Sequence, residues 1–513
     1  MANKSLFASL LGKSTDTVNH AGGKAYKLSN RQALAQLAAT GCLNQTFYVN
    51  PESQLNELMQ AARKVEPDFL AKTAIYTRQN GYMKDTPALL TAMLATESPV
   101  HLPQAFPKVV NNGKMLRNFV QIMRSGVTGR QSLGSRPKRL VQTWLNEASD
   151  RALLQASVGQ SPSLADVIKM VHPKPVSKER EAFFAWIVGK PCDFAMLPKA
   201  VKEYIAFKEN ASGPIPDVPF QMLTALPLTA KHWAKIAERG GWHMLRMNLN
   251  TFQRHGVFEL SGTARKLAHR LADKEEIRRA RVFPYQLLAA WKNADPKLPP
   301  EVREALQDAM EVAVQNVPAL HGNVVVCPDV SGSMTMPVTG YRPGASSKVS
   351  CVDVAGLIAA AVLRKNPRAE VLPFDTAVRK VQLNPRDAIV TNAQKLAMYG
   401  GGTSCSAPLA ELNRVKARPD LVILVSDNES WADRHYGRGT GVMKEWVELK
   451  RCAPDAKLVC LDIAPYATTP AYERPDVLNV GGFSDNVFEV IAAFSKGQLG
   501  PDHWVGEIEK VKL

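Results

Sequence analysis

Runs of consecutive apolar residues alternate with helical patterns in the last third of the chain, and this alternation constrains the fold more than any other feature. Continuous apolar strands separated by helices are typical of a parallel sheet that is covered on both faces. We therefore expect an α/β domain over residues 321–513, with its functional groups at the carboxyl ends of the strands. The apolar runs are 323–329, 370–375, 420–427 and 457–463, and the helical patterns are 351–365, 408–416, 441–452 and 486–494.

Residues 1–320 follow a different pattern, in which apolar residues recur at helical spacing. Segments such as 31–41 and 52–65 carry an apolar stripe and end in short turns. Helix pairs of this kind stack because a single pair cannot bury its own apolar face. The pattern predicts an all-α helical-repeat array, with an irregular helical bundle as the alternative. Because 513 residues exceed one hydrophobic core, we expect two domains, 1–320 and 321–513.

The excess of basic residues belongs to the helical part. Residues 1–320 hold 42 Lys and Arg against 26 Asp and Glu, whereas residues 321–513 hold 22 against 21. A folded domain with such an excess attracts polyanions, of which nucleic acids are the commonest. The alternative is a basic surface that is only solvated.

A glycine-rich basic stretch within the helical part is the candidate nucleic-acid contact. No acidic residue interrupts residues 123–144. A basic loop that leads into a helix can meet phosphates through side chains and backbone N–H groups together, although a solvated loop is the alternative. The candidate residues are Arg124, Arg130, Arg136, Lys138 and Arg139, and a second basic spot comprises Lys169, His172 and Lys174.

The stretch CPDVSGSM places one carboxylate and two hydroxyls at alternate positions after an apolar run. These are Asp329, Ser331 and Ser333; Thr403 follows three glycines, and Asp427 ends another apolar run. All five donors are hard oxygen atoms, which suit Mg²⁺ and not zinc. We predict a divalent-metal site from these residues. Because hydroxyls carry no charge, we expect the ion to take a further acidic ligand from a partner.

Each residue of this set could also have an ordinary structural role, as a helix cap, a turn residue or a strand end. No P-loop, zinc-protease or nucleophile-elbow motif occurs in the sequence. The Ser-Gly-Ser stretch with His321 and Asp329 could suggest a catalytic triad, but the sequence shows no oxyanion hole to accompany it. We therefore predict no catalytic residue.

The five metal residues resemble the metal-ion-dependent adhesion site of von Willebrand factor A domains, with every position matched. The helical part resembles the TROVE module of the Ro 60 kDa autoantigen family over residues 19–49, 166–175 and 244–258. Together the two resemblances cover nearly the whole chain. They imply a HEAT-like helical ring bridged by a Rossmann-like von Willebrand factor A domain. In the family, the two serines and the threonine coordinate the metal directly.

The resemblance also implies a function. Family members are non-catalytic RNA-binding proteins that bind Y RNAs on a basic outer surface and pass single-stranded 3′ ends of misfolded noncoding RNAs through the ring. Bacterial relatives associate with Y-like RNAs and an exoribonuclease. We expect a cytoplasmic, monomeric ring that serves RNA quality control. The alternative is a metal-dependent adaptor whose basic helical part docks an acidic protein.

One part of the family pattern is altered in this chain. His172 matches a histidine that the family uses for Y RNA, with Lys174 beside it. Basic residues that the family carries 13 to 17 positions earlier are replaced here by Gln155 and Gly159. Either the contact differs in detail, or the basic element at 136–139 takes over.

Other features of the sequence fit a protein of the reducing cytosol. The seven cysteines form no C-x-x-C pair, and no run of 18 apolar residues occurs. The short apolar patch at 5–11 lacks a cleavage pattern, so we do not expect a signal peptide. The polar loop 334–350 follows the metal motif, and it is either a gate or a simple insertion.

Overall fold

The contacts of the chain divide it into two compact units. The sheet unit comprises residues 1–65, 271–294 and 303–510, and the helical unit comprises 66–270, 295–302 and 511–513. The predicted boundary near residue 320 lies between the helix that ends at Val314 and the strand that begins at Val324, whereas the compact units divide at other points. The computed structural model describes residues 13–40, 43–211, 213–280, 282, 284–315, 317–342, 344, 346–397, 400–433, 439–482, 485–497 and 503–513, so the apolar patch at 5–11 lies outside it.

The sheet unit is built on five parallel strands in the order β4-β3-β5-β6-β8. Four of them coincide with the predicted apolar runs. The fifth, β8, was missed because its sequence VLNVG is short and interrupted by asparagine. The strands are β3 (Val324–Pro328), β4 (Glu370–Val371), β5 (Leu421–Ser426), β6 (Lys457–Asp462) and β8 (Val477–Gly481).

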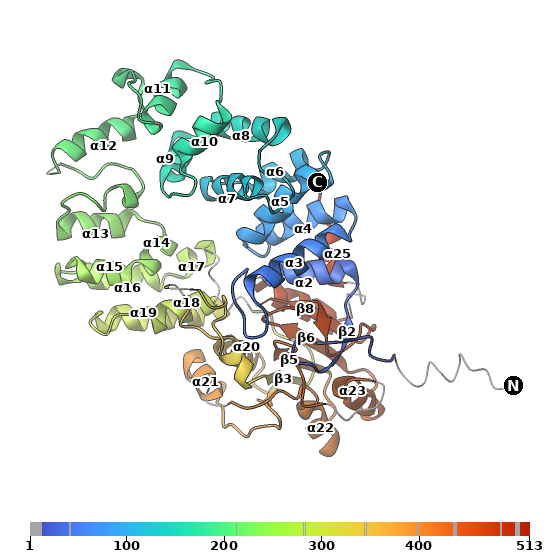
Figure 1. Cartoon of the computed structure of the whole chain (residues 1–513). Coiled ribbons are helices and arrows are strands. Elements are labelled where there is room, and N and C mark those ends of the chain that lie inside the picture. Colours follow the sequence, from blue (N-terminus) through green and yellow to red (C-terminus); the bar gives the residue numbers. More distant parts are fainter. Residues whose placement is uncertain are drawn as a thin grey trace. The chain divides into compact units, whose positions relative to one another are not determined.

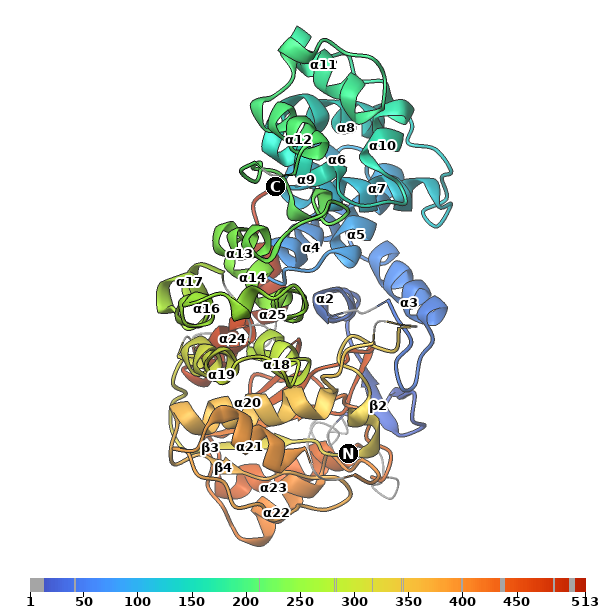
Figure 2. The same ribbon diagram turned by 90° about the vertical axis from the view of Figure 1, so that its left-hand side faces the viewer.

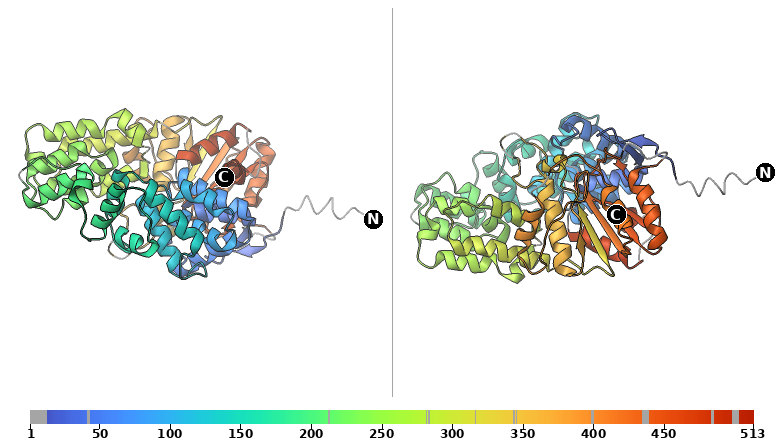
Figure 3. Two further views of the ribbon diagram at one scale, coloured as in Figure 1. Left: turned by 90° about the horizontal axis from the view of Figure 1, so that it is seen from above. Right: turned by 90° about the horizontal axis from the view of Figure 1, so that it is seen from below.

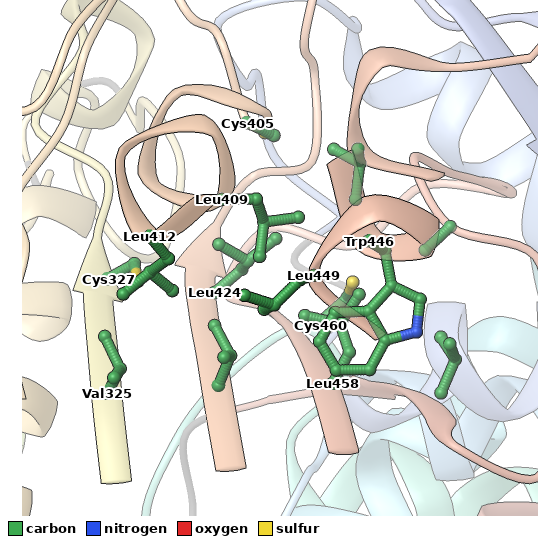
Figure 4. Packing of buried hydrophobic residues seen from close by; sticks show 14 of the residues in the cluster. Val325, Cys327, Cys405, Leu409, Leu412, Leu424, Trp446, Leu449, Leu458 and Cys460 are labelled. Carbon is green, nitrogen blue, oxygen red and sulfur yellow. The ribbon is translucent and has the colours of Figure 1, made fainter. Parts of the chain in front are cut away.

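Alternate residues of these strands point to opposite faces, and helices cover both. Val325 and Cys327 of β3 pack with α22 (Ala407–Arg414) and α23 (Gly441–Cys452), around the buried indole of Trp446 (Figure 4). α20 (Cys351–Lys365) packs on β3 and β4 at the other face, and α21 (Ile389–Leu396) packs on α20 (Figures 1 and 2). The predicted α/β class is therefore confirmed.

The first described residues of the chain belong to this unit. β1 (Thr17–Val18) and β2 (Lys24–Lys27) form a second small sheet with β7 (Thr468–Thr469), and all its pairs are antiparallel. α2 (Asn30–Thr40) packs on β8, so N-terminal and C-terminal segments lie side by side (Figure 3). The other helices of the unit are α3 (Pro51–Arg63), α17 (Lys274–Ala280), α18 (Pro284–Lys292), α24 (Asp485–Ser495) and α25 (His503–Glu509), and α19 (Pro300–Val314) crosses between the units.

The helical unit is a succession of short helices packed on their neighbours, as predicted. α4 packs on α5 and α6, α5 on α7, and α7 on α9 (Figure 1). Gly113 explains one close packing, because a Cβ there would lie 2.1 Å from the Cβ of Ala156. The helices are α4 (Pro67–Gln79), α5 (Asp85–Glu97), α6 (Leu102–Val109), α7 (Gly113–Arg124), α8 (Ser135–Glu147), α9 (Asp150–Ser157), α10 (Leu164–Val171), α11 (Lys178–Ile187), α12 (Lys199–Glu209), α13 (Ala230–Arg239), α14 (Trp242–Met247), α15 (Leu249–Arg254) and α16 (Thr263–Leu271).

Among the described residues, no helix combines the length and the hydropathy needed to cross a bilayer. Of the six cysteines that the structure describes, four are buried. Closure of the helices into a ring stays a prediction.

Trp446 is expected to be the largest single contributor to the core below α23. Its side chain is fully buried, and its indole N–H donates to the carboxylate of Asp476 at 3.1 Å. Trp446→Ala should lower the free energy of unfolding by about 3–5 kcal/mol, measured by urea denaturation. Trp446→Phe keeps most of the ring and should cost much less. Equal losses in the two variants would contradict this account of the core.

Candidate metal centre and basic surface

The two aspartates of the predicted metal set lie at the ends of neighbouring strands. Pro328, the last residue of β3, pairs with Val425 of β5, and the backbone N–H of Asp329 donates to the Val425 carbonyl at 2.8 Å. Asp427 follows β5 directly. Parallel pairing in this register therefore brings both carboxylates to the same edge of the sheet, as the sequence predicted.

The two serines are placed by a tight turn after Asp329. The Ser331 N–H donates to Asp329 Oδ1 at 2.8 Å, and the hydroxyls of Ser331 and Ser333 lie 3.3 Å apart. Gly332 donates to the Gly401 carbonyl at 2.8 Å, and a Cβ on Gly332 would lie only 3.2 Å from that oxygen. A side chain at this position would need the Gly401 segment to shift by a small amount.

The same contact brings in the threonine. Gly401 lies two residues before Thr403, whose carbonyl accepts from the N–H of Trp431 and of Ala432 at 3.2 and 3.0 Å. A Cβ on Gly402 would lie 2.5 Å from the Trp431 ring. The glycine-rich segment is thus held between the serine turn and the loop that follows Asp427.

All five predicted donors are buried, with exposed fractions of 0 to 4 %. Burial and the charge of Asp427 raise the pKa of Asp329 to about 7, and burial also raises the pKa of Asp427. Asp427 Oδ2 has no hydrogen-bond partner. Two adjacent buried carboxylates with an unpaired oxygen are costly unless a cation accompanies them, so the residues present fit a hard divalent ion.

The set combines two carboxylates with three hydroxyls. The described residues contain no group of three or more His, Cys, Asp or Glu arranged to hold a metal. Hydroxyl ligands are therefore essential to any ion bound here. The donor set and its occupancy by Mg²⁺ both stay predictions.

Two further buried carboxylates at this edge were missed by sequence reasoning. Burial and the charge of Asp427 raise the pKa of Glu429 to about 8; its Oε2 accepts from the Ala21 N–H at 2.9 Å, and its Oε1 has no partner. Burial likewise raises the pKa of Asp462, at the end of β6. Its oxygens accept from the Ala464 N–H and from Gln36 Nε2. The available signal was the stretch VSDNES, in which an acid follows Asp427 by two residues.

The N-terminal segment covers the metal set. The amide of Asn19 donates to the Ser430 carbonyl at 2.8 Å, and a Cβ on Gly23 would lie 1.9 Å from that oxygen. Tyr48 approaches from a second part of this segment. Its pKa is raised by burial and by the negative charges of Asp427 and Glu429, although a hydrogen bond with Ser333 opposes the shift.

The N-terminal segment also holds the loop 334–350, through Asn44 and Gln45. The Tyr341 N–H donates to the Gln45 carbonyl at 2.6 Å, and Asn44 Nδ2 donates to the Thr339 carbonyl at 2.8 Å. Residues 343 and 345 of the loop lie outside the described part of the chain. Its described residues are held by backbone contacts, which favours an insertion over a freely moving gate.

The triad that the sequence could suggest is not assembled. His321 is exposed and precedes β3, whereas Asp329 and the serines follow it. The length of the strand separates the imidazole from the hydroxyls, so the two cannot exchange a proton directly.

Part of the predicted basic set surrounds a hollow at the start of α8. The hollow has a volume of about 450 Å³ and is lined by Arg130, Arg136 and Arg139 together with Pro99 and the backbone of Gly134. Arg136 donates to the Pro99 carbonyl at 2.6 Å. Gly134 has a φ of +70° and offers no side chain to cap the helix. The positive end of the helix dipole therefore adds to three guanidinium groups.

The second basic spot is attached to the same helix. Gln142 Nε2 donates to the Val171 carbonyl at 2.6 Å, and Asn146 Nδ2 donates to the Lys174 carbonyl at 2.9 Å. Lys138 lies one helical turn before Gln142, on the same face of α8. His172 ends α10 with a φ of +47°, and His172, Lys174, Lys169 and Arg124 are all exposed. α8 thus connects the two basic spots.

A half-buried arginine lies beside the altered family position. The guanidinium of Arg117 lies over Gly159, because a Cβ on that glycine would lie 2.2 Å from Arg117 Nη1. Its Nε and Nη1 are buried without a hydrogen-bond partner, and burial lowers its pKa. Arg117 precedes Arg124 by seven residues, so both lie on one face of α7. Arg117 was missed because it is outside the glycine-rich stretch.

The sequence of this chain is similar to those of known proteins. Residues 323–495 match the family model described as the Ro60 vWA domain. Over 522 aligned residues the chain is 26 % identical to the RNA-binding protein RO60 of Deinococcus radiodurans, covering 94 % of this chain and 95 % of that protein. The resemblance to the Ro 60 kDa family is confirmed.

Two further comparisons agree with this result. The RNA-binding protein RO60 of Caenorhabditis elegans is 26 % identical over 255 residues, which are 45 % of this chain and 37 % of that protein. The crystal structure of the Deinococcus radiodurans RO (RSR) protein aligns with a TM-score of 0.64 and 21 % identity, covering 92 % of this chain and 100 % of that chain. The Ro60-like combination of a helical part and an α/β part is therefore confirmed for the fold.

The ion pair between Arg379 and Asp375 should stabilise the segment that carries Thr403. Arg379 donates twice to the buried carboxylate, at 2.6 and 3.1 Å, and the Asp375 carbonyl accepts from the N–H of Ser404. Burial alone would raise the pKa of Asp375, but Arg379 outweighs burial and holds it below its usual range. Arg379→Met should lower the free energy of unfolding by about 2 kcal/mol, because Asp375 is buried but Arg379 is partly exposed.

The effect should depend on pH in a defined direction. In the wild type, the Asp375 contribution is present above the unfolded pKa of about 3.9 and is lost as the pH falls through the lower folded pKa. In the variant, the charged carboxylate is a penalty that protonation removes. The difference between the two proteins, measured by urea denaturation, should therefore be largest at neutral pH and shrink in acid. Arg414→Met, which breaks an exposed pair with Glu411, is the control and should show little effect.

Proposed function

We propose that this protein is a non-catalytic RNA-binding protein of the Ro type. Its helical unit binds RNA, and its sheet unit binds a divalent metal ion. The observation that carries the proposal is the basic surface arranged around α8, in a chain for which two similar curated proteins are named RNA-binding proteins. The predicted basic residues are exposed or half-buried and lie within one compact unit.

The chemistry of this surface suits a phosphate backbone. The hollow at the start of α8 offers guanidinium groups and the positive end of a helix, which together favour phosphate. The neighbouring spot around His172 extends the surface along the same helix. Contacts of this kind give affinity without sequence readout, so structure in the RNA would decide which molecules bind.

The finer assignments rest on the family resemblance. Y-like RNAs would bind on the α7–α8–α10 surface, with Arg117 in the place of the basic residue that Gly159 lacks. Single-stranded 3′ ends of misfolded RNAs would enter a ring cavity, and an exoribonuclease would act on the bound RNA. In this scheme the protein is a cytoplasmic scaffold for RNA quality control.

The metal would be held by Ser331, Ser333 and Thr403, with Asp329 and Asp427 coordinating directly or through water. A bound Mg²⁺ would supply two positive charges to a buried acidic edge. Asp329 and Asp427 would then remain ionised, and the serine turn and the Thr403 segment would be joined through one centre.

Charge reversal on α8 should test the RNA surface. The triple variant Arg136→Glu, Lys138→Glu, Arg139→Glu should weaken binding of a structured small RNA at least tenfold and should flatten the dependence of log K on log salt. Filter binding or fluorescence anisotropy at several salt concentrations measures both effects. The full-length chain is used because residues 1–65 pack within the sheet unit.

A control must carry the same charge change elsewhere on the helical unit. Lys199→Glu, Lys208→Glu, Arg254→Glu changes three exposed residues outside the α8 surface. Equal losses in both triple variants would indicate a diffuse field and would remove the α8 surface as the site. Absence of RNA affinity in the wild type, with capture of an acidic protein, would favour the adaptor function.

The metal site predicts a stabilising effect of Mg²⁺. At 100 times its dissociation constant, an ion that binds only the folded state adds about 2.7 kcal/mol to the free energy of unfolding. Mg²⁺ should therefore raise the melting temperature of the wild type and leave that of Asp427→Asn unchanged. Differential scanning fluorimetry with and without a chelator provides the measurement. A wild type that does not respond to Mg²⁺ or Mn²⁺ would contradict the proposed metal site.

A further inference from the structure

We propose that the hollow at the start of α8 binds a terminal phosphate group of RNA, the monoester or triphosphate at a chain end, in preference to the phosphodiesters within the chain. This inference rests on the RNA binding proposed above and deepens it, because it names the part of the RNA that the hollow takes. The second basic spot, around His172, is left to the phosphates along the chain.

The first argument is that the arginines of the hollow have few other groups to bind. Arg130, Arg136 and Arg139 line it, and none of its lining residues is acidic. The Arg136 guanidinium donates to the Pro99 carbonyl, whereas no side-chain hydrogen bond or ion pair of Arg130 or Arg139 occurs among the described residues. Three guanidinium groups around one hollow repel one another, and an anion between them relieves this repulsion.

The second argument is the position of Arg130 beside the first turn of α8. A Cβ on Gly134 would lie 3.1 Å from Arg130 Nη1. In the described part of the chain, no group accepts from the backbone N–H of Ser135 or Arg136, and the first turn has no acidic residue. A cation at the positive end of a helix dipole is unfavourable by itself. A phosphate placed there accepts from the guanidinium groups and the backbone N–H groups together.

The third argument is the amount of charge that the hollow can neutralise. A phosphodiester carries one negative charge, whereas a phosphate monoester carries about 1.5 to 2 at neutral pH. Three guanidinium groups and the partial charge of about +0.5 at a helix N-terminus exceed the single charge of a phosphodiester. A terminal phosphate also has three unesterified oxygens, so it can accept a bidentate pair from one arginine and further hydrogen bonds from the others.

The shape of the hollow also favours a chain end. Its volume is about 450 Å³, and its walls come from α5, the turn before α6, the loop that carries Arg130 and the start of α8. An internal phosphate needs space for the RNA chain on both of its sides, whereas a terminal phosphate needs it on one side. Ala95, Pro99 and Leu102 form an apolar wall against which the sugar or base of the terminal nucleotide can pack.

Lys169 provides a matched control for the hollow. It is exposed in the last turn of α10 and does not line the hollow. Lys169→Gln and Arg130→Gln each remove one positive charge from the basic surface, but the second removes it from the hollow. A general effect of charge weakens RNA binding in both variants. Recognition of a terminal phosphate is seen in the dependence of affinity on the RNA end.

The experiment uses one structured RNA hairpin with four kinds of end: a 5′-triphosphate, a 5′-monophosphate, hydroxyl groups at both ends, or a 3′-phosphate. Fluorescence anisotropy with the full-length protein gives the four dissociation constants. The wild type should bind an RNA with a terminal phosphate roughly tenfold more tightly than the RNA with two hydroxyl ends. The 5′ and 3′ forms show which end is taken, and inorganic pyrophosphate should reduce the preference by competition.

The variants connect this preference to the hollow. In Arg130→Gln, the ratio of the dissociation constants for hydroxyl and phosphate ends should fall to near one. Arg139→Gln should have the same effect and is a second test, because Arg139 is exposed and its removal leaves the core packing intact. Lys169→Gln should weaken binding of all four RNAs and keep the ratio of the wild type.

The outcomes separate this inference from the proposed function. A wild type that binds no RNA overturns both together. A wild type that binds RNA with the same affinity whatever its ends overturns the terminal-phosphate site alone. A preference that survives in both Arg130→Gln and Arg139→Gln removes the hollow as the site of the RNA end. A preference that is lost equally in Lys169→Gln assigns it to the charge of the whole surface, which also overturns the inference.

Discussion

The buried carboxylates at the carboxyl edge of the sheet repel one another, and the groups packed around them in the sheet unit must reduce this repulsion. Asp329 and Asp427 come together because β3 and β5 pair in parallel, and Glu429 adds a third charge two residues later. The serine hydroxyls, the Thr403 segment and the backbone N–H groups of the N-terminal segment all surround this edge with donors. These hydrogen-bond donors reduce the repulsion but do not neutralise the charges, and this favours the proposed cation.

The helical unit differs, because its excess charge is positive. These charges lie near water, so they lose little solvation free energy, and helix α8 positions several of them. The start of α8 gathers arginines at its positive end, and Gln142 and Asn146, farther along it, fix the backbone of residues 171–174. The two proposed binding chemistries, for a polyanion and for a cation, thus occur in separate compact units. Each unit has its own local means of holding its charges in position.

The sequence predicted those parts of the fold and the site that depend on local pattern. The four apolar runs became strands, and strand ends placed Asp329 and Asp427 together, as parallel sheets require. It did not predict that Asn19 and Ala21 contact the loop after Asp427, because these contacts join residues about four hundred positions apart. Asn19 and Ser430, for example, are separated by 411 residues. Arg117 was missed for a related reason, since only packing places it over Gly159.

The pairing of β2 with β7 has a consequence for how the protein is made. Residues 13–40 leave the ribosome well before their partners at Ser430 and Thr468. At usual translation rates, Asn19 waits about 20 to 80 s for Ser430 to be synthesised. During that time Tyr26, which is destined for the sheet core, has no partner surface. The nascent chain therefore carries this segment without its partners during that interval, when chaperones could bind it.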